Sequence, residues 1–349
     1  MKFDLLRACV RLYDHYESLM PVNHYYGLLA IYGLCRTAEA AGDEALLDRC
    51  RTILRPFVEG KVKHNTNFEM YWIGGIPAAY MLMRGYMPEI KGTVAQAAED
   101  LMRKAPRDRR GIFCHPRYPG QGRIWIDVCM AVTPFLLFAG LALDRAEYIE
   151  EAAAQTLMMI DELLDRDCGL LHQCKNFGGP GVLSEDHWGR GNGWGLLGLT
   201  ELIQYLPGAS PRRREVEARF RELTRALLAH QAPSGMWRQE IPDPTSYEES
   251  SATGLIAYGL GVGLRCGVLG EDARPHFRKA LEGLAACVGD DGSIHHVCIG
   301  CLYPGGIEAY KAREKRTDDP HGFGPAILAF SEAARHGIRE VEPAALQAG

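Results

Sequence analysis

Asp127 combines the residue type and the setting that proton transfer requires. In the stretch IWIDVCM, it is a single carboxyl group entering an otherwise apolar helical pattern, two residues after Trp125. Burial disfavours the charged form of a carboxyl group and raises its pKa toward neutrality, as a general acid requires. The alternative is that Asp127 only caps a helix, because the helical run begins there.

A second group of chemically useful residues lies in the stretch HWGRGNGW. Arg190 can bind both oxygens of a carboxylate through its planar guanidinium, and Trp188 and Trp194 offer flat faces suited to sugar rings. A structural ion pair with Glu185 or Asp186 is the alternative for Arg190, and one of the two tryptophans is expected in the core. We expect the glycines to let the backbone of a loop approach a ligand closely.

Helices must position these residues, because nearly every long segment has apolar residues at steps of three and four. The helices come in pairs, the first apolar nearly all round and the second charged on one face, as inner and outer helices would be. Six such hairpins, with the N-terminal helix completing the sixth, predict an all-α (α/α)6 barrel. We expect one domain over residues 1–349, with short β-hairpins possible near GLLHQCKN and GMWRQEI.

The loops before the inner helices should meet at one end of such a barrel. They gather the Gly, Trp, His, Arg and Asp residues, in NTNFEMYWIGG, HPRYPGQGRIWID, SEDHWGRGNGW, SYEESSATG and DDPHGFG. Helix N-termini favour anions, and tryptophan and tyrosine side chains suit sugar rings. This end is therefore the predicted site.

Composition excludes several classes of function. A net charge of −5 argues against general affinity for nucleic acid or anionic membranes, and no apolar run is long enough to span a bilayer. The 11 cysteines are odd in number and irregularly spaced, which favours reduced thiols in a cytoplasmic protein. The stretch HHVCIGC places four potential ligands, two histidines and two cysteines, within seven residues, too close together to surround one zinc ion readily. We expect neither a metal nor a cofactor.

Five stretches of the sequence, taken in order, carry a resemblance to known enzymes: IWIDVCMAVTPFL, GLLHQC, WGRGNGWGLLGLTELIQYLP, EESSATGLIAYGL and DDPHGFGPAILAFSE. With them the sequence resembles the unsaturated glucuronyl and rhamnogalacturonyl hydrolases of glycoside hydrolase families 88 and 105. The similarity extends from about residue 20 to 337 and is closer to family 105. It implies the same barrel. It also implies a substrate produced by a polysaccharide lyase, with a C4=C5 double bond conjugated to a carboxylate, and a rhamnogalacturonan-type disaccharide is favoured.

The reaction implied by the resemblance is hydration of a vinyl ether. An acid protonates C4, water adds at C5, and the resulting hemiketal collapses to release the aglycone, so that one carboxyl group can serve as acid and then as base. Asp127 matches the family's acid/base aspartate. Glu69 falls where the family usually has an aspartate, so its role is open, and a surface loop glutamate is the alternative.

The resemblance also implies the residues that bind substrate. They are His115, Trp125, His172, Arg190, Trp194, His321 and Tyr26, although Tyr25 could face the site instead of Tyr26. Each histidine could instead be a hydrogen-bonded residue in a turn. We expect the enzyme to act as a monomer or homodimer.

Two other hypotheses stay open at this level. An epimerase of the N-acylglucosamine epimerase type would share the barrel but use a pair of histidines, leaving Asp127 unnecessary. A non-catalytic carbohydrate-binding barrel would bind a sugar without turnover. The glutamate at position 69, where the family usually has an aspartate, is the feature that supports this hypothesis. Fold alone cannot separate these functions.

Overall fold

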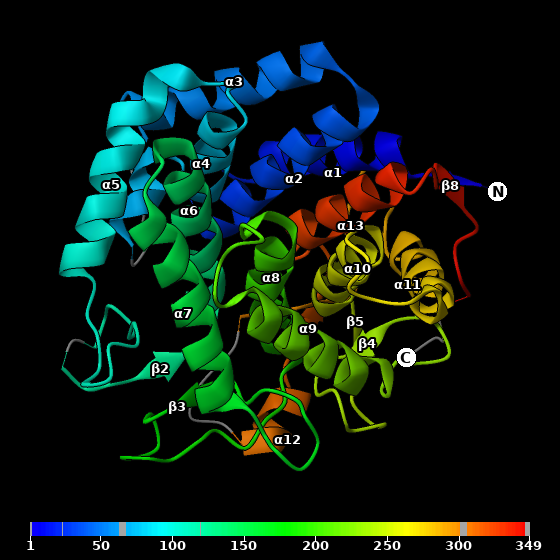
Figure 1. Cartoon of the computed structure of the whole chain (residues 1–349). Coiled ribbons are helices and arrows are strands. Elements are labelled where there is room, and N and C mark those ends of the chain that lie inside the picture. The colour runs from blue at the N-terminus through cyan, green and yellow to red at the C-terminus, as the bar shows by residue number, and fades with distance from the viewer. Residues whose placement is uncertain (1, 23, 63–67, 119, 301–305, 346–349) are drawn as a thin grey trace.

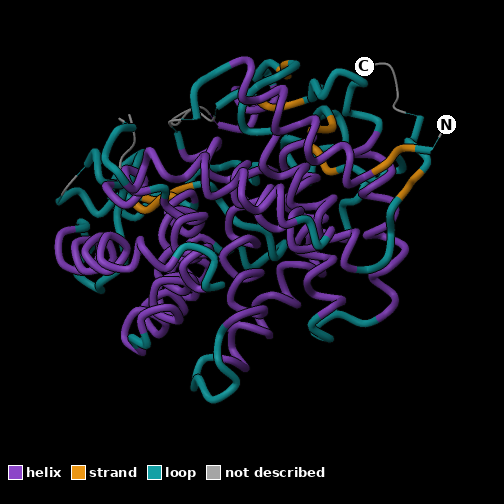
Figure 2. The backbone as a smooth tube through the Cα atoms, turned by 90° about the horizontal axis from the view of Figure 1, so that it is seen from above, coloured by secondary structure: helices purple, strands orange, loops and turns teal. Residues whose placement is uncertain are grey.

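Helices dominate the computed structural model, which describes residues 2–22, 24–62, 68–118, 120–300 and 306–345. The strands are short pieces in the loops (Figure 2). The helices are α1 Leu5–Leu19, α2 Tyr25–Ala41, α3 Glu44–Val58, α4 Gly75–Met83, α5 Lys91–Lys104, α6 Asp127–Leu143, α7 Ala146–Leu163, α8 Gly189–Tyr205, α9 Arg213–Leu228, α10 Ser250–Arg265, α11 Arg274–Ala285, α12 Gly306–Lys311 and α13 Phe323–Arg335.

Within the described residues, six helices form an inner ring and six an outer ring, which confirms the predicted barrel (Figure 1). The inner ring is α2, α4, α6, α8, α10 and α13, and α13 closes it by packing on α2. The outer helices α3, α5, α7, α9 and α11 each follow an inner helix. The sixth, α1, packs on α13, as expected from the sequence.

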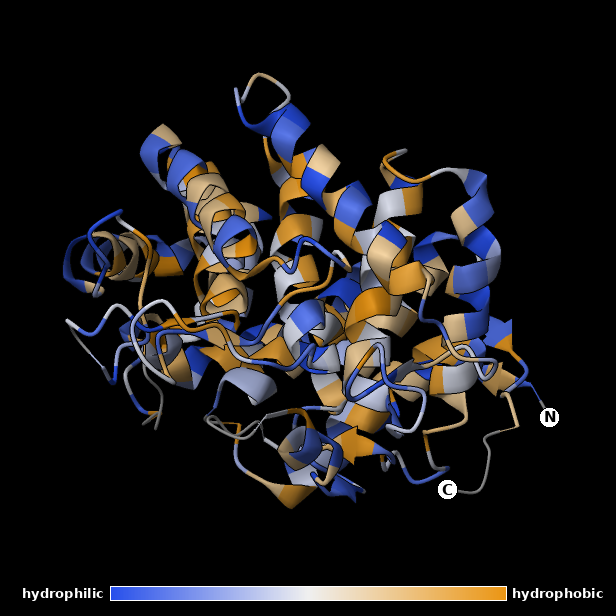
Figure 3. Ribbon diagram, turned by 90° about the horizontal axis from the view of Figure 1, so that it is seen from below, coloured by the Kyte–Doolittle hydropathy of each residue, from blue (hydrophilic) through white to orange (hydrophobic). Residues whose placement is uncertain are grey.

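Apolar composition separates the two rings. The inner helix α8 is buried at every residue from Gly189 to Ile203, whereas the outer helix α9 buries five residues along one face. Figure 3 shows the same contrast, with hydrophobic residues filling the interior and hydrophilic residues covering the outer helices. None of the described helices is both long and apolar enough to cross a bilayer.

Three two-stranded sheets join the loops at the end where the inner helices begin. Their strands are β2 Ile124–Trp125 with β3 Cys174–Lys175, β4 Trp237–Arg238 with β5 Glu248–Glu249, and β6 Val297–Cys298 with β7 Lys315–Arg316. Strands β3 and β4 fall in the two stretches where short hairpins were expected, but each pairs with a strand outside its stretch, β3 with β2 and β4 with β5. A fourth pair, β1 Phe3–Asp4 with β8 Glu340–Val341, joins the two ends of the described chain.

The glycine-rich stretch that we expected to be a loop lies mostly inside α8, which begins at Gly189. The reason is close packing. A Cβ atom at Gly195 would lie 2.5 Å from a side-chain atom of Leu171, and one at Gly189 would lie 2.5 Å from the carbonyl oxygen of Arg238. The glycines therefore bring α8 close to its neighbours, rather than a loop close to a ligand.

We expect Gly189→Ala to destabilise the protein by about 1–3 kcal/mol, because the added methyl group would meet backbone that can move only with β4. Thermal unfolding followed by circular dichroism measures the effect. Gly208→Ala is the matched control, since no atom lies within 4 Å of a Cβ there and its unfolding temperature should match wild type. Equal stability of all three proteins would contradict the close-packing explanation.

Candidate active site

Three consecutive inner helices, α6, α8 and α10, begin with the same backbone contact. A backbone N–H at the start of each helix donates to a backbone carbonyl in the loop that follows the next outer helix in the sequence. The contacts are Ile126 to Gln173 (3.0 Å), Gly189 to Gln239 (2.7 Å) and Ser250 to His296 (2.9 Å). The residues that follow are Asp127, Arg190 and Ser251. They therefore occupy equivalent positions in the first turns of three neighbouring helices.

Asp127 combines partial exposure with a buried carboxylate oxygen. Ile126, not Asp127, is the cap residue of α6, and its side chain makes no capping hydrogen bond. The Oδ2 atom of Asp127 is buried and has no hydrogen-bond partner among the described residues. Burial raises the pKa of this carboxyl to about 7, although the positive charge of Arg190 acts in the opposite direction.

Arg190 is fully buried, and its charge acts on several groups of the site. Its Nη1 atom donates to Ser251 Oγ (3.0 Å) and to the Cys298 carbonyl (2.6 Å), and Nη2 donates to the Ile299 carbonyl (3.1 Å). Its guanidinium carbon lies 4.6 Å from the ring centroid of Trp188, in a cation–π contact. The two terminal nitrogens that we expected to bind a substrate carboxylate thus already donate to protein oxygens.

A chain of hydrogen bonds lies where α13 meets α2. Asp319 Oδ1 is 2.6 Å from His321 Nδ1, and His321 Nε2 is 2.7 Å from the hydroxyl of Tyr25. Burial and the charge of Arg190 lower the pKa of His321, which favours neutral imidazole. Tyr26 packs edge-on against His321 with ring centroids 5.3 Å apart. Both tyrosines therefore contact His321, and the hydrogen bond belongs to Tyr25.

His115 and Trp125 lie in one aromatic cluster. Their ring centroids are 5.0 Å apart, and Phe177 meets the indole edge-on at 5.1 Å. Burial and the neighbouring cations Arg117 and Arg123 lower the pKa of His115 to about 4, so this imidazole is neutral at physiological pH. Trp125 is partly exposed and lies two residues before Asp127, which suits it to contact a sugar.

His172 lies with His187 in a second cluster, where their ring centroids are 5.0 Å apart. Burial and the charge of His187 lower the pKa of His172. His187 Nε2 is 2.9 Å from Asp165 Oδ2 and 3.5 Å from Cys168 Sγ, and these three ligand atoms lie within 4.8 Å of one another. Among the described residues, this trio is the one grouped closely enough to hold a metal, and a histidine–carboxylate hydrogen bond explains its arrangement without one.

Two expected site residues differ in their exposure to solvent, one being exposed and the other buried. Glu69 begins a short 3₁₀ helix over Glu69–Ile73 and is exposed, beside a pocket that Asp100 and Pro116 also line. Trp194 is 1% exposed and belongs to the hydrophobic core, as does Trp188. A sugar cannot stack on a ring that is covered on all sides, so Trp125 offers the better surface.

Sequence reasoning missed several buried polar residues near these helix starts. Tyr71 lies close enough to Asp127 for the carboxylate to help raise its pKa, although burial is the larger cause. The side-chain amides of Gln173 and Gln239 are buried and have no hydrogen-bond partner among the described residues. No sequence motif pointed to these two glutamines. They share a position because the backbone carbonyl of each accepts a hydrogen bond from the start of an inner helix, a contact that only the structure shows.

A buried pair of carboxyl groups was also missed. Burial raises the pKa of Asp186 to about 6, and the carboxylate of Glu240 adds to the effect. Glu240 also accepts a hydrogen bond from the backbone N–H of His187 (2.8 Å), which places the pair beside the start of α8. The acidic run Glu185–Asp186 could have suggested it, but Glu240 lies more than fifty residues away in the sequence.

Comparisons with known proteins agree with this architecture. An unsaturated rhamnogalacturonyl hydrolase, YesR of Bacillus subtilis (strain 168), is 26% identical over 319 residues, covering 88% of this chain and 89% of the relative. An unsaturated 3S-rhamnoglycuronyl hydrolase of Formosa agariphila is 27% identical over 49% of this chain and 48% of its own length.

Solved structures show the same fold. A possible member of the GH105 family from Salmonella enterica superposes with a TM-score of 0.79 at 24% identity, covering 90% of this chain and 83% of that one. A family 105 glycoside hydrolase of C. acetobutylicum gives 0.80 at 20% identity, covering 93% and 98%. The family model described as Glycosyl Hydrolase Family 88 matches residues 8–336. The chain therefore belongs to glycosyl hydrolase family 88.

Proposed function

We propose that this glycosyl hydrolase releases a 4,5-unsaturated uronic acid from the non-reducing end of oligosaccharides left by a polysaccharide lyase. A rhamnogalacturonan-type disaccharide is the favoured substrate, and the cytoplasm is the expected compartment. The names of the relatives support this substrate class, and family membership favours a glycosidase over the epimerase hypothesis. The observation that carries the proposal is the partly open Asp127 carboxyl at the first turn of α6, with one buried oxygen that has no hydrogen-bond partner in the described part of the chain.

In the first step, the Asp127 carboxyl gives its proton to C4 of the substrate. The π electrons of the C4=C5 bond form the new C–H bond, and the ring oxygen shares the positive charge left at C5. Water then adds to C5 while the Asp127 carboxylate takes its proton. The hemiketal opens to a ketone at C5 and a hemiacetal at C1, and the hemiacetal collapses to an aldehyde and the free aglycone.

The other residues bind and orient the sugar in this proposal. Trp125 stacks on a ring beside the scissile bond, with His115 behind it. His172 and the pair Tyr25–His321 donate to or accept from sugar hydroxyls. Arg190 acts through its charge, favouring the carboxylate form of Asp127 that the second step requires and attracting the uronate. Glu69 and Trp194 have no assigned role.

The test is the ultraviolet absorbance of the conjugated double bond during incubation with a panel of lyase-generated unsaturated disaccharides. Hydration removes the conjugation, so absorbance should fall and one keto-uronate should appear for each aglycone released. Stable absorbance with every substrate, from a protein shown to be folded, would reject the proposal.

The same assay gives the expected pH dependence. The first step uses protonated Asp127, whose pKa is about 7, so kcat/KM should fall by about tenfold per pH unit above that value. Because the charge of Arg190 lowers this pKa, Arg190→Gln should move the alkaline limb to higher pH. If the alkaline limb of the kcat/KM profile does not move in a folded Arg190→Gln protein, a group other than Asp127 is responsible for that limb.

A further inference from the structure

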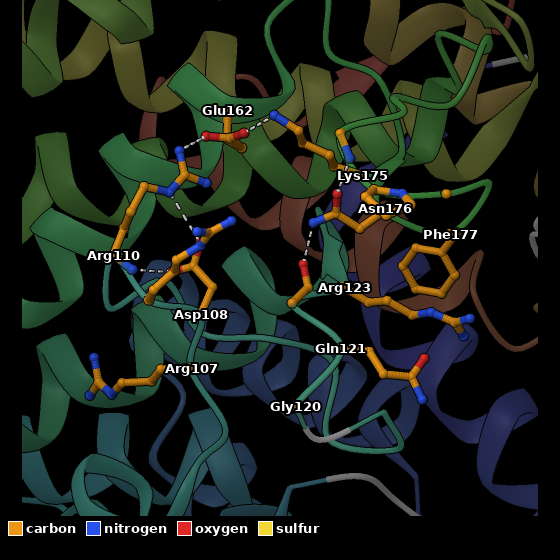
Figure 4. Close-up of a pocket in the computed structure, with 15 residues that line it drawn as sticks. Arg107, Asp108, Arg110, Gly120, Gln121, Arg123, Glu162, Lys175, Asn176 and Phe177 are labelled. Atoms are coloured by element: carbon orange, nitrogen blue, oxygen red, sulfur yellow. Dashed lines mark hydrogen bonds and ion pairs between the residues drawn. The ribbon is translucent and has the colours of Figure 1, made fainter.

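A polar groove of about 870 Å³ lies beside the site, between the loops that carry β2 and β3. Figure 4 shows its walls. Asn176 fixes them relative to each other, because its Nδ2 donates to the Gly122 carbonyl (2.6 Å) and its Oδ1 accepts from the Gly181 N–H (2.7 Å). The groove therefore has a defined shape before any ligand enters.

Positive charge dominates this groove, although the chain as a whole carries −5. Five cationic side chains and two carboxylates line it: Arg107, Arg109, Arg110, Arg123 and Lys175, with Asp108 and Glu162. Most of these cations are paired. Glu162 holds both Arg110 and Lys175, Asp108 also binds Arg110 (3.1 Å), and Arg107 pairs with Glu151 outside the lining.

Two of the five cationic side chains in the groove, Arg109 and Arg123, are not held by a carboxylate of the described residues. Within the described part of the chain, no carboxylate lies within ion-pair distance of Arg109 or Arg123. The Arg123 guanidinium carbon is 4.2 Å from the ring centroid of Tyr118 and 5.0 Å from that of Phe177. Aromatic rings hold a guanidinium in place without using its N–H groups as carboxylates do, so Arg123 can still bind an anion.

The backbone before α6 connects this groove to Asp127. From Arg123 to Asp127, partly exposed and fully buried residues alternate, with Ile124 and Ile126 buried. Arg123 and Trp125 thus face the same open side of an extended segment, and the partly exposed Asp127 follows at the start of α6, because the backbone becomes helical at Ile126. Four residues span at most about 14 Å, a length that a few linked sugars can cover.

We propose that this groove binds an anionic group, a carboxylate or a sulfate, on the part of the oligosaccharide that leaves after hydrolysis. The inference rests on the proposed function, since it extends the same substrate from Asp127 past Trp125 to Arg123. It refines the proposed substrate, because an unsaturated oligosaccharide with a second negative charge beyond the scissile bond should be hydrolysed more efficiently than the disaccharide with a neutral aglycone.

The experiment compares kcat/KM for three unsaturated substrates: a disaccharide with a neutral aglycone, one with a sulfated aglycone, and a tetrasaccharide with a second uronate. Wild type should prefer at least one of the anionic substrates, and added NaCl should reduce that preference. Arg123→Gln should lower kcat/KM on the preferred anionic substrate by about tenfold and on the neutral one by less than about threefold. Arg109→Gln, at an exposed position where folding is not at risk, should act in the same direction.

Arg103→Gln is the matched control, because Arg103 is an exposed arginine on α5 outside the groove, and it should leave all three values unchanged. Equal kcat/KM for the three wild-type reactions, or equal losses on neutral and anionic substrates in Arg123→Gln, would overturn the inference while hydrolysis itself upholds the proposed function. Hydrolysis of none of the three would overturn the proposed function, and the inference with it.

Discussion

Replacing Asp127 by asparagine is expected to lower kcat by about 10³- to 10⁴-fold on any unsaturated substrate that wild type hydrolyses. The amide has nearly the shape of the carboxyl group but can neither give a proton to C4 nor accept one from water. One residue serves both steps, so the loss should lie at the upper end of the range for general acid–base groups. Single-turnover absorbance measurements would show it, and substrate binding should change little.

The same substitution is expected to stabilise the protein in a pH-dependent way. The folded-state pKa of Asp127 is about 7, raised by burial, whereas the ordinary value is 3.8. The folded protein therefore binds more protons than the unfolded chain between these values, and the ionised group costs stability as pH rises. Asp127→Asn should unfold at the wild-type temperature near pH 4 and be more stable by about 2 kcal/mol near pH 8.

These two measurements separate a catalytic role from a structural one. A capping or ion-paired aspartate would lose stability on conversion to asparagine, whereas a buried acid kept for chemistry should lose activity and gain stability. An Asp127→Asn protein with wild-type activity would refute the assignment and favour the epimerase hypothesis, in which Asp127 is unnecessary.

The second large effect is expected at the opposite end of the barrel. Arg36 of α2 is fully buried there and donates to Tyr205 (3.1 Å), Gln204 (3.0 Å) and Glu332 (3.0 Å). Glu201 is also fully buried, and burial raises its pKa although the charge of Arg36 opposes that rise. Arg36→Met should therefore leave buried carboxylates short of positive charge, at a cost of about 3 kcal/mol.

Denaturant unfolding would measure that loss. Arg265 still contacts Glu332 (2.6 Å), so the protein should fold, and kcat/KM should stay close to wild type because the substitution lies at the far ends of the inner helices. Adding Glu332→Gln to Arg36→Met should recover part of the stability, since it removes a charge left without its partner. An unchanged unfolding midpoint in Arg36→Met would show that the network contributes little.

Periodicity predicted the barrel well because each inner helix must be apolar on every side. Apolar residues recur at steps of three and four from His24 to Gly42, and the structure places the helix at Tyr25–Ala41. It ends where Gly42 adopts a left-handed conformation with φ of 65°. The start of α8 was predicted too late. Glycine is a poor helix former, and the packing that brings Gly189 and Gly195 into a helix comes from residues distant in sequence.

The candidate site was harder to predict than the fold. Asp127 stood out because a single charge in an apolar run is visible in the sequence. The engagement of Arg190 by Ser251 and by the carbonyls of Cys298 and Ile299 was not visible, because these partners lie more than sixty positions away. Glu69 matched by its spacing, but spacing does not determine whether a side chain points inward.

The closure of the ring by α13 has a consequence for how the protein is made. Cys9 of α1 donates its thiol hydrogen to the carbonyl of Ile327, 318 positions later, and β1 pairs with β8. During synthesis on a ribosome, the apolar faces of α1 and α2 therefore stay uncovered until almost the whole chain has been made, because their partner helix α13 emerges last. Such distant contacts slow folding and leave apolar surface open to aggregation. Expression yield should depend strongly on temperature and on chaperones that shield nascent helices.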